Sequence, residues 1–282
     1  MSLVFNQLKE RAQQWQVTIQ ETQETPGSVL AFGVSRGSRV VLKVTKQHGD
    51  EWRSGEVLRA FDGHGTVRVL EFDAGAVLLE RLDPGEPLVN LVRHGQDERA
   101  TQILAELMGQ MAYRAAPEHS PTLLDWSHGF DRYLKRGDEQ VPHDLVAEAR
   151  ECYQRLVASQ QTLMLLHGDL QHYNALFDTK RGWVAIDPKG VVGELEYEVG
   201  AILRNPVELS DLYTSLAAVE RRLEILAGTL KLDHNRALCW AFAQGVLSAI
   251  WDVEDGYRPQ SDNSALRLAH IIKRLVREII TL

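Results

Sequence analysis

The chain has 282 residues, of which 44% are hydrophobic and 25% are charged, and its formal net charge is -8. This composition is that of a folded protein long enough for one large domain or two lobes, and its acidic balance argues against a nucleic-acid binder, because phosphate backbones are bound by clustered cations. No apolar run approaches the roughly 18 residues that cross a bilayer, and the N-terminus lacks the apolar core of a signal peptide, so we expect no membrane partner and a cytoplasmic location.

The first third of the chain is predicted to be rich in β-strands. Segments with many β-branched residues lie at 28–34, 38–45, 66–72 and 75–81. The first two flank Arg36 and Gly37, which suggests an antiparallel hairpin. Between the two strand pairs, the segment 49–61 has apolar residues at helical intervals, so we expect a small sheet with one helix.

The segment LDPGEP (82–87) marks a predicted boundary, because two prolines around a glycine interrupt regular structure. The pattern beyond it is mostly helical. Amphipathic stripes are found at 97–113, 144–160, 210–231, 235–252 and 264–281. We therefore expect an α+β protein with an N-lobe at 1–82, a hinge at 83–89 and a helical C-lobe at 90–282.

The stretch LHGDLQHYNALF places a polar loop between two apolar segments. Asp169 and Asn174 lie five residues apart in this loop, and Asp187 follows in the strand-like segment GWVAIDPKG (182–190). This is the spacing of a kinase catalytic centre, in which one Asp deprotonates an alcohol while an Asn and a second Asp hold Mg²⁺ against ATP phosphates. Single Asp and Asn residues are also common in loops, so the prediction depends on the three together.

The chain resembles the aminoglycoside phosphotransferases, and within them the aminoglycoside/hydroxyurea resistance kinases. The resemblance is carried by LHGDLQHYNALF and VAIDPKGVVGELEYEVGAILRNP, with weaker matches at VLKV, VLRAFDGHGTVRVLE and LSAIWDVEDG. It implies a protein-kinase-like fold, with a small antiparallel sheet in the N-lobe and a larger helical C-lobe. It also implies transfer of the γ-phosphoryl group of ATP, with Mg²⁺, to a hydroxyl of an aminoglycoside-like acceptor.

The resemblance assigns roles to residues that match the family's motifs. Asp169 would be the catalytic base, and Asn174 and Asp187 would ligate Mg²⁺. Lys43 interrupts the apolar sequence VVLKV and would contact the α- and β-phosphates. Lys189, two residues after Asp187, would bring positive charge toward the transferred group or lie in solvent.

A glutamate on the helix after Lys43 would pair with that lysine, and Glu51 and Glu56 are both candidates. They differ by about 140° around a helix, so only one can face inward. Glu51 shares the face of Leu58 and is preferred. The family branch often has its glutamate at the place of Ser54, which leaves the identity of the pair open.

Two further groups of residues are placed by the resemblance. Backbone groups of Glu80, Arg81 and Leu82 would hold adenine at the hinge. In the segment IWDVEDG (250–256), Asp252 continues a buried stripe and is expected to face a cleft. There Asp252, Glu254 and Asp255 would bind a cationic acceptor, and Trp251 would add an apolar or cation-π wall. The other tryptophans, such as Trp126 and Trp183, are expected in the core.

The fold does not fix the acceptor. A kinase for another small alcohol, such as a sugar or a choline-like compound, is therefore an alternative. A non-catalytic nucleotide-binding protein is another, although the joint presence of Lys43, Asp169, Asn174 and Asp187 argues against it. ATP versus GTP, the phosphorylated hydroxyl and the oligomeric state are left open by the sequence.

Overall fold

The computed structural model describes residues 3–47, 49–257 and 263–280 of the chain. The N-terminal elements are α1 (Leu3–Gln14), β1 (Val17–Glu24), β2 (Ser28–Ser35), β3 (Ser38–Thr45), α2 (Ser54–Phe61), β4 (Val69–Asp73) and β5 (Ala76–Glu80). The elements that follow are β6 (Pro84–Pro87), α3 (Val89–Arg93), α4 (Asp97–Met111), α5 (Leu123–Arg136), α6 (His143–Ala158), β7 (Met164–Leu166), β8 (Ala175–Asp178), β9 (Gly182–Ala185), β10 (Val191–Gly193), α7 (Val199–Leu203), α8 (Ser210–Tyr213), α9 (Leu216–Leu230), α10 (His234–Glu254) and α11 (Ser264–Ile280).

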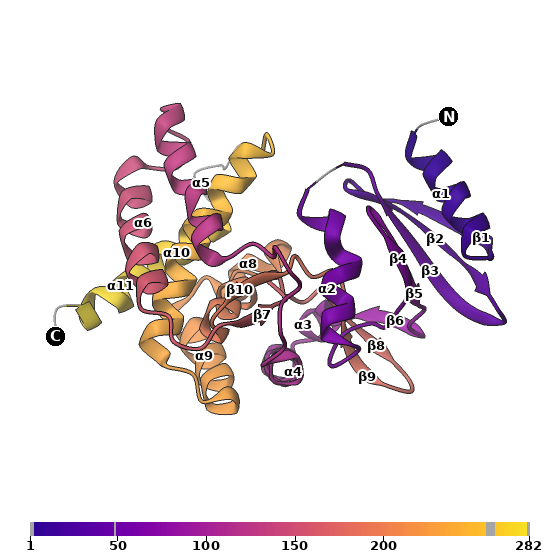
Figure 1. Ribbon diagram of the computed structural model, residues 1–282. Coiled ribbons are helices and arrows are strands. Elements are labelled where there is room, and N and C mark those ends of the chain that lie inside the picture. The colour runs from indigo at the N-terminus through magenta and orange to yellow at the C-terminus, as the bar shows by residue number, and fades with distance from the viewer. Residues whose placement is uncertain (1–2, 48, 258–262, 281–282) are drawn as a thin grey trace.

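These elements form a β-rich part beside a larger, mostly helical part, with α1 and α11 at opposite ends of the molecule (Figure 1). The arrangement confirms the predicted α+β class with a small antiparallel sheet. The segment 83–89, predicted as the hinge, contains β6, which pairs with β8. The bounds of the two lobes stay a prediction.

The five-stranded sheet has the order β1-β2-β3-β5-β4, with antiparallel neighbours throughout. β2 and β3 form the predicted hairpin, and both turn residues, Arg36 and Gly37, have positive φ, as a two-residue turn between twisted strands requires. Successive side chains of β3 point to opposite faces of the sheet. Leu42 is buried in the cluster that α1 covers, whereas Lys43 lines a cavity on the other face.

The N-terminal part departs from the sequence expectation at three places. No element is predicted before residue 28, yet α1 and β1 precede it; most of β1 is exposed, so the alternation that reveals a half-buried strand is missing. The helix predicted at 49–61 is a 3-10 turn at Asp50–Arg53 followed by α2. The strand predicted from residue 66 begins at Val69, because residues 66 and 67 pair with Ala185 instead.

In the helical part, α10 packs against α6, α7 and α11, and α4 packs against α9. Four predicted stripes are confirmed as α4, α6, α10 and α11, although position 281 of the last stripe lies outside the described residues. The stripe at 210–231 is split into α8 and α9, because Ser215 is extended and caps α9 through a hydrogen bond from the Ala218 amide. Helix α5 has no counterpart in the prediction. Its buried face includes Ser127 and Gly129, which weaken the apolar pattern.

Two small sheets frame the polar loop. β7 precedes the loop and pairs with β10, while β8 follows it and pairs with β6 and β9. The strand predicted in 182–190 ends at Ala185, before Asp187, because Asp187 has a φ of 61° that does not continue a strand. Within the described residues, none of the helices is long and apolar enough to cross a membrane.

Candidate active site

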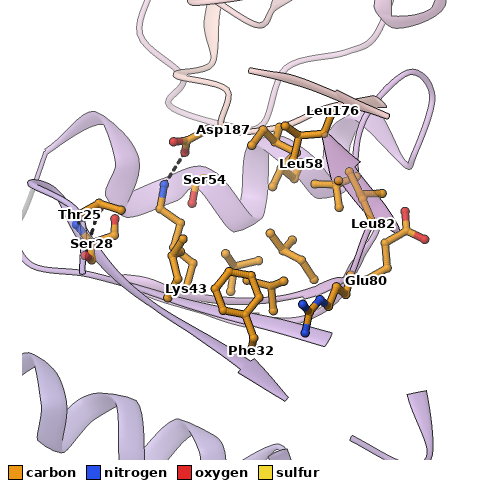
Figure 2. Close-up of a pocket in the computed structure, with 18 of the residues that line it drawn as sticks. Thr25, Ser28, Phe32, Lys43, Ser54, Leu58, Glu80, Leu82, Leu176 and Asp187 are labelled. Atoms are coloured by element: carbon orange, nitrogen blue, oxygen red, sulfur yellow. Dashed lines mark hydrogen bonds and ion pairs between the residues drawn. The ribbon is translucent and has the colours of Figure 1, made fainter. Parts of the chain in front are cut away.

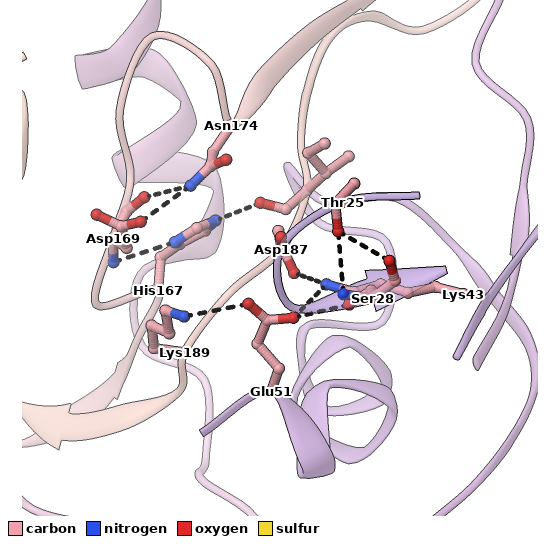
Figure 3. A network of polar contacts seen from close by, with 10 residues as sticks. Thr25, Ser28, Lys43, Glu51, His167, Asp169, Asn174, Asp187 and Lys189 are labelled. Atoms are coloured by element: carbon pink, nitrogen blue, oxygen red, sulfur yellow. Dashed lines mark hydrogen bonds and ion pairs between the residues drawn. The ribbon is translucent and has the colours of Figure 1, made fainter. Parts of the chain in front are cut away.

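The polar loop is held in shape by His167. This side chain is buried, its Nε2 donates to the carbonyl oxygen of Ile186 at 2.9 Å, and its Nδ1 accepts from the Asp169 amide at 3.3 Å (Figure 3). Burial lowers the pKa of His167 to about 4, so the ring is neutral and has the one donor and one acceptor that these bonds need. His167 therefore connects Asp169 with the segment that carries Asp187.

Two buried glutamates lie near the polar loop, and one of them contacts it. Glu198 accepts from the Gly168 amide at 2.9 Å, and its burial raises its pKa to about 7. Glu194 accepts hydrogen bonds from Arg236 and from the indole of Trp240, both on α10. Glu198 therefore holds the loop through a hydrogen bond to its backbone, whereas Glu194 joins its own segment to α10.

Asp169 lies at the centre of a set of hydrogen bonds. The side-chain amide of Asn174 donates to the Asp169 backbone oxygen at 2.9 Å and to its Oδ2 at 3.2 Å. Arg204 Nη2 lies 3.4 Å from Asp169 Oδ1, and Arg204 Nη1 donates to Gln244 at 2.7 Å. Burial raises the pKa of Asp169, and the charge of Arg204 partly opposes this effect. A carboxylate that is held in place and has a raised pKa suits a general base.

Arg204 is a site residue that sequence reasoning missed. Its side chain is only 11% exposed, and the signal available was a single arginine at the end of the apolar run VGAIL. Such an arginine needs a buried partner, but the sequence does not identify that partner. The structure shows that it is Asp169, which lies 35 residues away along the chain.

Replacing Arg204 with Met is expected to shift the pH dependence of kcat/KM. Without the cation, the pKa of Asp169 rises further, and a base works only when deprotonated. The pH below which kcat/KM decreases should therefore be higher by about one unit in the variant. Steady-state rates from pH 5 to 9 test this, with Arg267→Gln, a change at an exposed arginine paired with Asp211, as the control. An unshifted profile would contradict the role of Arg204.

On the other side of the loop, Lys43 contacts two carboxylates. Its Nζ lies 2.9 Å from Glu51 Oε2 and forms an ion pair with Asp187 (Figure 3). The second oxygen of Glu51 lies 3.4 Å from Lys189 Nζ. Burial alone would raise the pKa of Glu51, but Lys43 and Lys189 lower it to about 2. Glu56 pairs with Arg53 instead, so the structure resolves the open choice in favour of Glu51.

Glu51→Gln is expected to weaken the binding of Mg-ATP, the donor that the family resemblance implies, by about tenfold, the effect of losing one charge-assisted hydrogen bond. The amide oxygen can still accept the hydrogen bond from Ser28, which is 3.1 Å long in the wild type, but Lys43 loses a negative partner. Glu56→Gln is the matched control, because it changes a neighbouring glutamate without touching Lys43. Isothermal titration calorimetry should show less than a twofold change for it, and equal effects of both variants would refute this role of Glu51.

Lys43 and Asp187 form the polar end of a cavity of about 380 Å³, the nucleotide cavity (Figure 2). Its walls are mostly apolar and include Leu30, Phe32, Val41, Val77 and Leu79 from the sheet and Leu176 and Ile186 from the loop strands. Leu82 lines the far end. Glu80 also lines it, but its carboxylate is engaged by Arg181 and the Arg68 amide. A mostly apolar cavity with Lys43 and Asp187 at one end fits a purine nucleotide.

The predicted magnesium ligands lie on two segments that are joined by a backbone hydrogen bond. The amide of Ile186, the residue before Asp187, donates to the backbone oxygen of Asn174 at 2.8 Å. The side-chain NH₂ of Asn174 faces Asp169, and its amide oxygen points the other way (Figure 3). Asp187 and Asn174 thus present a carboxylate and an amide oxygen, the donors that Mg²⁺ prefers.

A second cavity, of about 480 Å³, opens at Asp169; we call it the acceptor cavity. All four residues predicted to bind an acceptor line it, namely Trp251, Asp252, Glu254 and Asp255. Burial raises the pKa of Asp252, in agreement with its predicted inward position. Trp126 packs against the core, as expected, and it also lines this cavity, where its ring meets that of Trp251 edge-on with 5.4 Å between the ring centroids. Trp183 also packs against the core.

Comparison with known proteins agrees with this geometry. A family model described as aminoglycoside/hydroxyurea antibiotic resistance kinase matches residues 14–256. A streptomycin 3''-kinase from Klebsiella pneumoniae is 33% identical over 237 residues, which cover 82% of this chain and 87% of that protein. A hydroxyurea phosphotransferase from Kitasatospora aureofaciens is 34% identical over 241 residues, which cover 81% of this chain and 66% of that protein.

Solved structures share the fold. A complex of the aminoglycoside phosphotransferase APH(4)-Ia with ADP and hygromycin B has a TM-score of 0.68 at 18% identity, covering 95% of this chain and 97% of that one. The choline kinase LicA of Streptococcus pneumoniae has a TM-score of 0.64 at 16% identity, covering 98% of this chain and 100% of that one. The fold is therefore the predicted protein-kinase-like fold. The chain belongs to the aminoglycoside/hydroxyurea antibiotic resistance kinase family and is a phosphotransferase that acts on a hydroxyl-type acceptor.

Proposed function

We propose that this phosphotransferase uses ATP and Mg²⁺ and transfers the γ-phosphoryl group to a hydroxyl of a cationic, streptomycin-like aminoglycoside. One observation carries the proposal. The polar loop lies between two cavities of different chemistry, a mostly apolar cavity that ends at Lys43 and Asp187 and an acidic cavity that opens at Asp169. A donor nucleotide in the first and an acceptor in the second would meet at the loop, as in-line transfer requires.

The residues on the nucleotide side have distinct roles in this proposal. Lys43, oriented by Glu51, would bind the α- and β-phosphates. Asn174 and Asp187 would hold Mg²⁺, which neutralises phosphate charge when bound. Backbone groups from Glu80 to Leu82 would hold adenine, and the segment 83–89 would be the hinge between lobes at 1–82 and 90–282.

On the acceptor side, Asp169 would orient the hydroxyl and take its proton. Asp252, Glu254 and Asp255 would attract ammonium or guanidinium groups, and Trp251 with Trp126 would form an apolar wall. The names of relatives support an acceptor of this class, since a streptomycin 6-kinase from Streptomyces glaucescens is 27% identical over 283 residues, which cover 94% of this chain and 88% of that protein. The hydroxyurea phosphotransferase makes a small uncharged hydroxyl compound the second candidate.

The test is an assay of nucleoside diphosphate release by the purified protein, with and without Mg²⁺, and with ATP or GTP as donor. Streptomycin, other aminoglycosides, hydroxyurea and simple alcohols serve as acceptors. We expect streptomycin to stimulate release with ATP and chelation of Mg²⁺ to abolish it. Stimulation by hydroxyurea alone would replace the cationic acceptor with the uncharged one, and stimulation by no aminoglycoside would refute the proposed substrate class.

A further inference from the structure

The acceptor cavity contains more acidic groups than are free to bind a ligand. Five carboxylates line it, from Asp125, Asp169, Asp252, Glu254 and Asp255. Asp125 accepts bonds from the amide and hydroxyl of Thr122, both at 2.7 Å, and so caps its own helix. Asp169 contacts Arg204 and, in the proposed function, accepts the proton of the acceptor hydroxyl. The cation-binding capacity of the cavity therefore depends on the remaining three.

One of those three, Glu254, already holds a guanidinium group from the protein itself. Arg132 Nε donates to Glu254 Oε1 at 3.2 Å, and Arg132 Nη2 donates to Oε2 at 3.3 Å. This is the two-point geometry in which carboxylates recognise guanidinium groups. Arg132 comes from α5 and Glu254 from the end of α10, so the pair links two walls of the cavity, and both residues line it.

The exposure of the pair makes it displaceable. The Arg132 side chain is 56% exposed and that of Glu254 is 23% exposed. An ion pair between partly exposed side chains adds little stability, so a ligand cation with the right geometry can compete for Glu254. Asp252 has a different environment: the side chain of Asn263 hydrogen bonds to it, and the positive charge of Arg204 acts on it.

We propose that Arg132 is a specificity-determining residue that competes with the acceptor for Glu254. With Arg132 in place, Asp252 and Asp255 remain for an acceptor cation, and a cationic group that binds Glu254 must first displace Arg132. A second cationic group directed at Glu254 therefore adds little to the binding of an acceptor while Arg132 is in place. This inference depends on the proposed function only for the statement that acceptors bind in this cavity.

The test compares binding of ethylguanidine, which has one cationic group, with binding of 1,4-diguanidinobutane, which has two. Titrations of the full-length protein loaded with ADP are followed by tryptophan fluorescence, because Trp126 and Trp251 line the cavity. The measured quantity is the ratio of the two dissociation constants. In the wild type this ratio should be near one, and Arg132→Gln should increase the preference for the bis-guanidinium probe by about three- to tenfold.

Two controls connect the effect to Glu254. Arg136→Gln removes an exposed arginine one turn along α5 that faces Asp138 and should leave the ratio unchanged. In a Glu254→Gln background, Arg132→Gln should change the ratio less than twofold. An unchanged ratio in Arg132→Gln, an equal change in Arg136→Gln, or no binding of either probe to any variant would overturn the inference. Turnover of hydroxyurea or another uncharged acceptor is assayed in parallel, so a failed substrate proposal is distinguished from a failed role of Arg132.

Discussion

Asp169→Asn is expected to lower kcat by about 10²- to 10⁴-fold, because an amide cannot take the proton of the attacking hydroxyl. The side chain keeps its size, and its carbonyl oxygen can still accept the hydrogen bond from Asn174, which is 3.2 Å long in the wild type. Affinity for Mg-ATP should change little, because Asp169 does not line the nucleotide cavity. A large loss of kcat with normal nucleotide binding would separate proton abstraction from nucleotide positioning.

The control for this variant is Asp211→Asn, the same chemical change at a carboxylate that is 94% exposed and is not among the residues that line the acceptor cavity. Thermal unfolding of both variants should match the wild type within a few degrees. If Asp169→Asn retains more than about a tenth of the wild-type kcat, it has lost less than one decade, and general-base catalysis by this residue is refuted.

The parts of the site that could be predicted from sequence are those set by local geometry. Asp169 and Asn174 share one loop, so five residues of separation fix them near each other. Lys43 was identifiable because a charge in a run of β-branched residues must point away from the core. Asp252 was identifiable from the phase of its helix. Each of these depends on the geometry of a single segment of chain, a loop, a strand or a helix.

The parts that could not be predicted depend on contacts between distant elements. The pairing of Arg204 with Asp169 and the contact of Trp126 with Trp251 arise only when separate elements pack together.

The same limit applies to two neighbouring arginines, Arg221 and Arg222. They are neighbours in sequence and both on α9, yet Arg222 is fully buried while the Arg221 side chain is 43% exposed. The helical period suggests which one faces inward but does not identify its partner.

The partner of Arg222 is Asp97, the first residue of α4. Arg222 Nε lies 3.1 and 3.2 Å from the two carboxylate oxygens, and Nη2 lies 2.5 Å from Oδ1. Its Nη1 donates to the backbone oxygens of Ile202 at 3.2 Å and Asn205 at 2.8 Å. This one guanidinium therefore joins α4 and α9 to the chain on either side of Arg204, the residue that contacts Asp169.

Asp97→Asn is expected to lower the free energy of unfolding by about 3–5 kcal/mol, because it leaves the buried charge of Arg222 without a negative partner. Glu98→Gln is the matched control, since Glu98 is the next residue and pairs with the neighbouring arginine, Arg221, at 3.3 Å, with both side chains largely exposed. That change should cost less than about 1 kcal/mol. Urea unfolding followed by circular dichroism measures both, and equal costs would contradict the importance of the buried pair.

The difference in the free energy of unfolding between the wild type and Asp97→Asn should also depend on pH, which gives a second test of the buried pair. Burial alone would raise the pKa of Asp97, but Arg222 lowers it below the usual value of 3.8. A lowered pKa stabilises the folded state above the unfolded pKa, and this contribution is lost as pH falls through the folded pKa. The gap between the wild type and Asp97→Asn should therefore stay constant from pH 8 to pH 5 and narrow only below about pH 4.

Loss of the Arg222–Asp97 pair should also affect the active site. Because Arg222 fixes the backbone oxygens of Ile202 and Asn205, a loosened Arg222 allows the segment that carries Arg204 to move relative to Asp169. We therefore expect folded Asp97→Asn to have a lower kcat than Glu98→Gln at a temperature where both are fully folded. A wild-type kcat in a strongly destabilised Asp97→Asn would mean that the buried pair stabilises the fold without positioning Arg204.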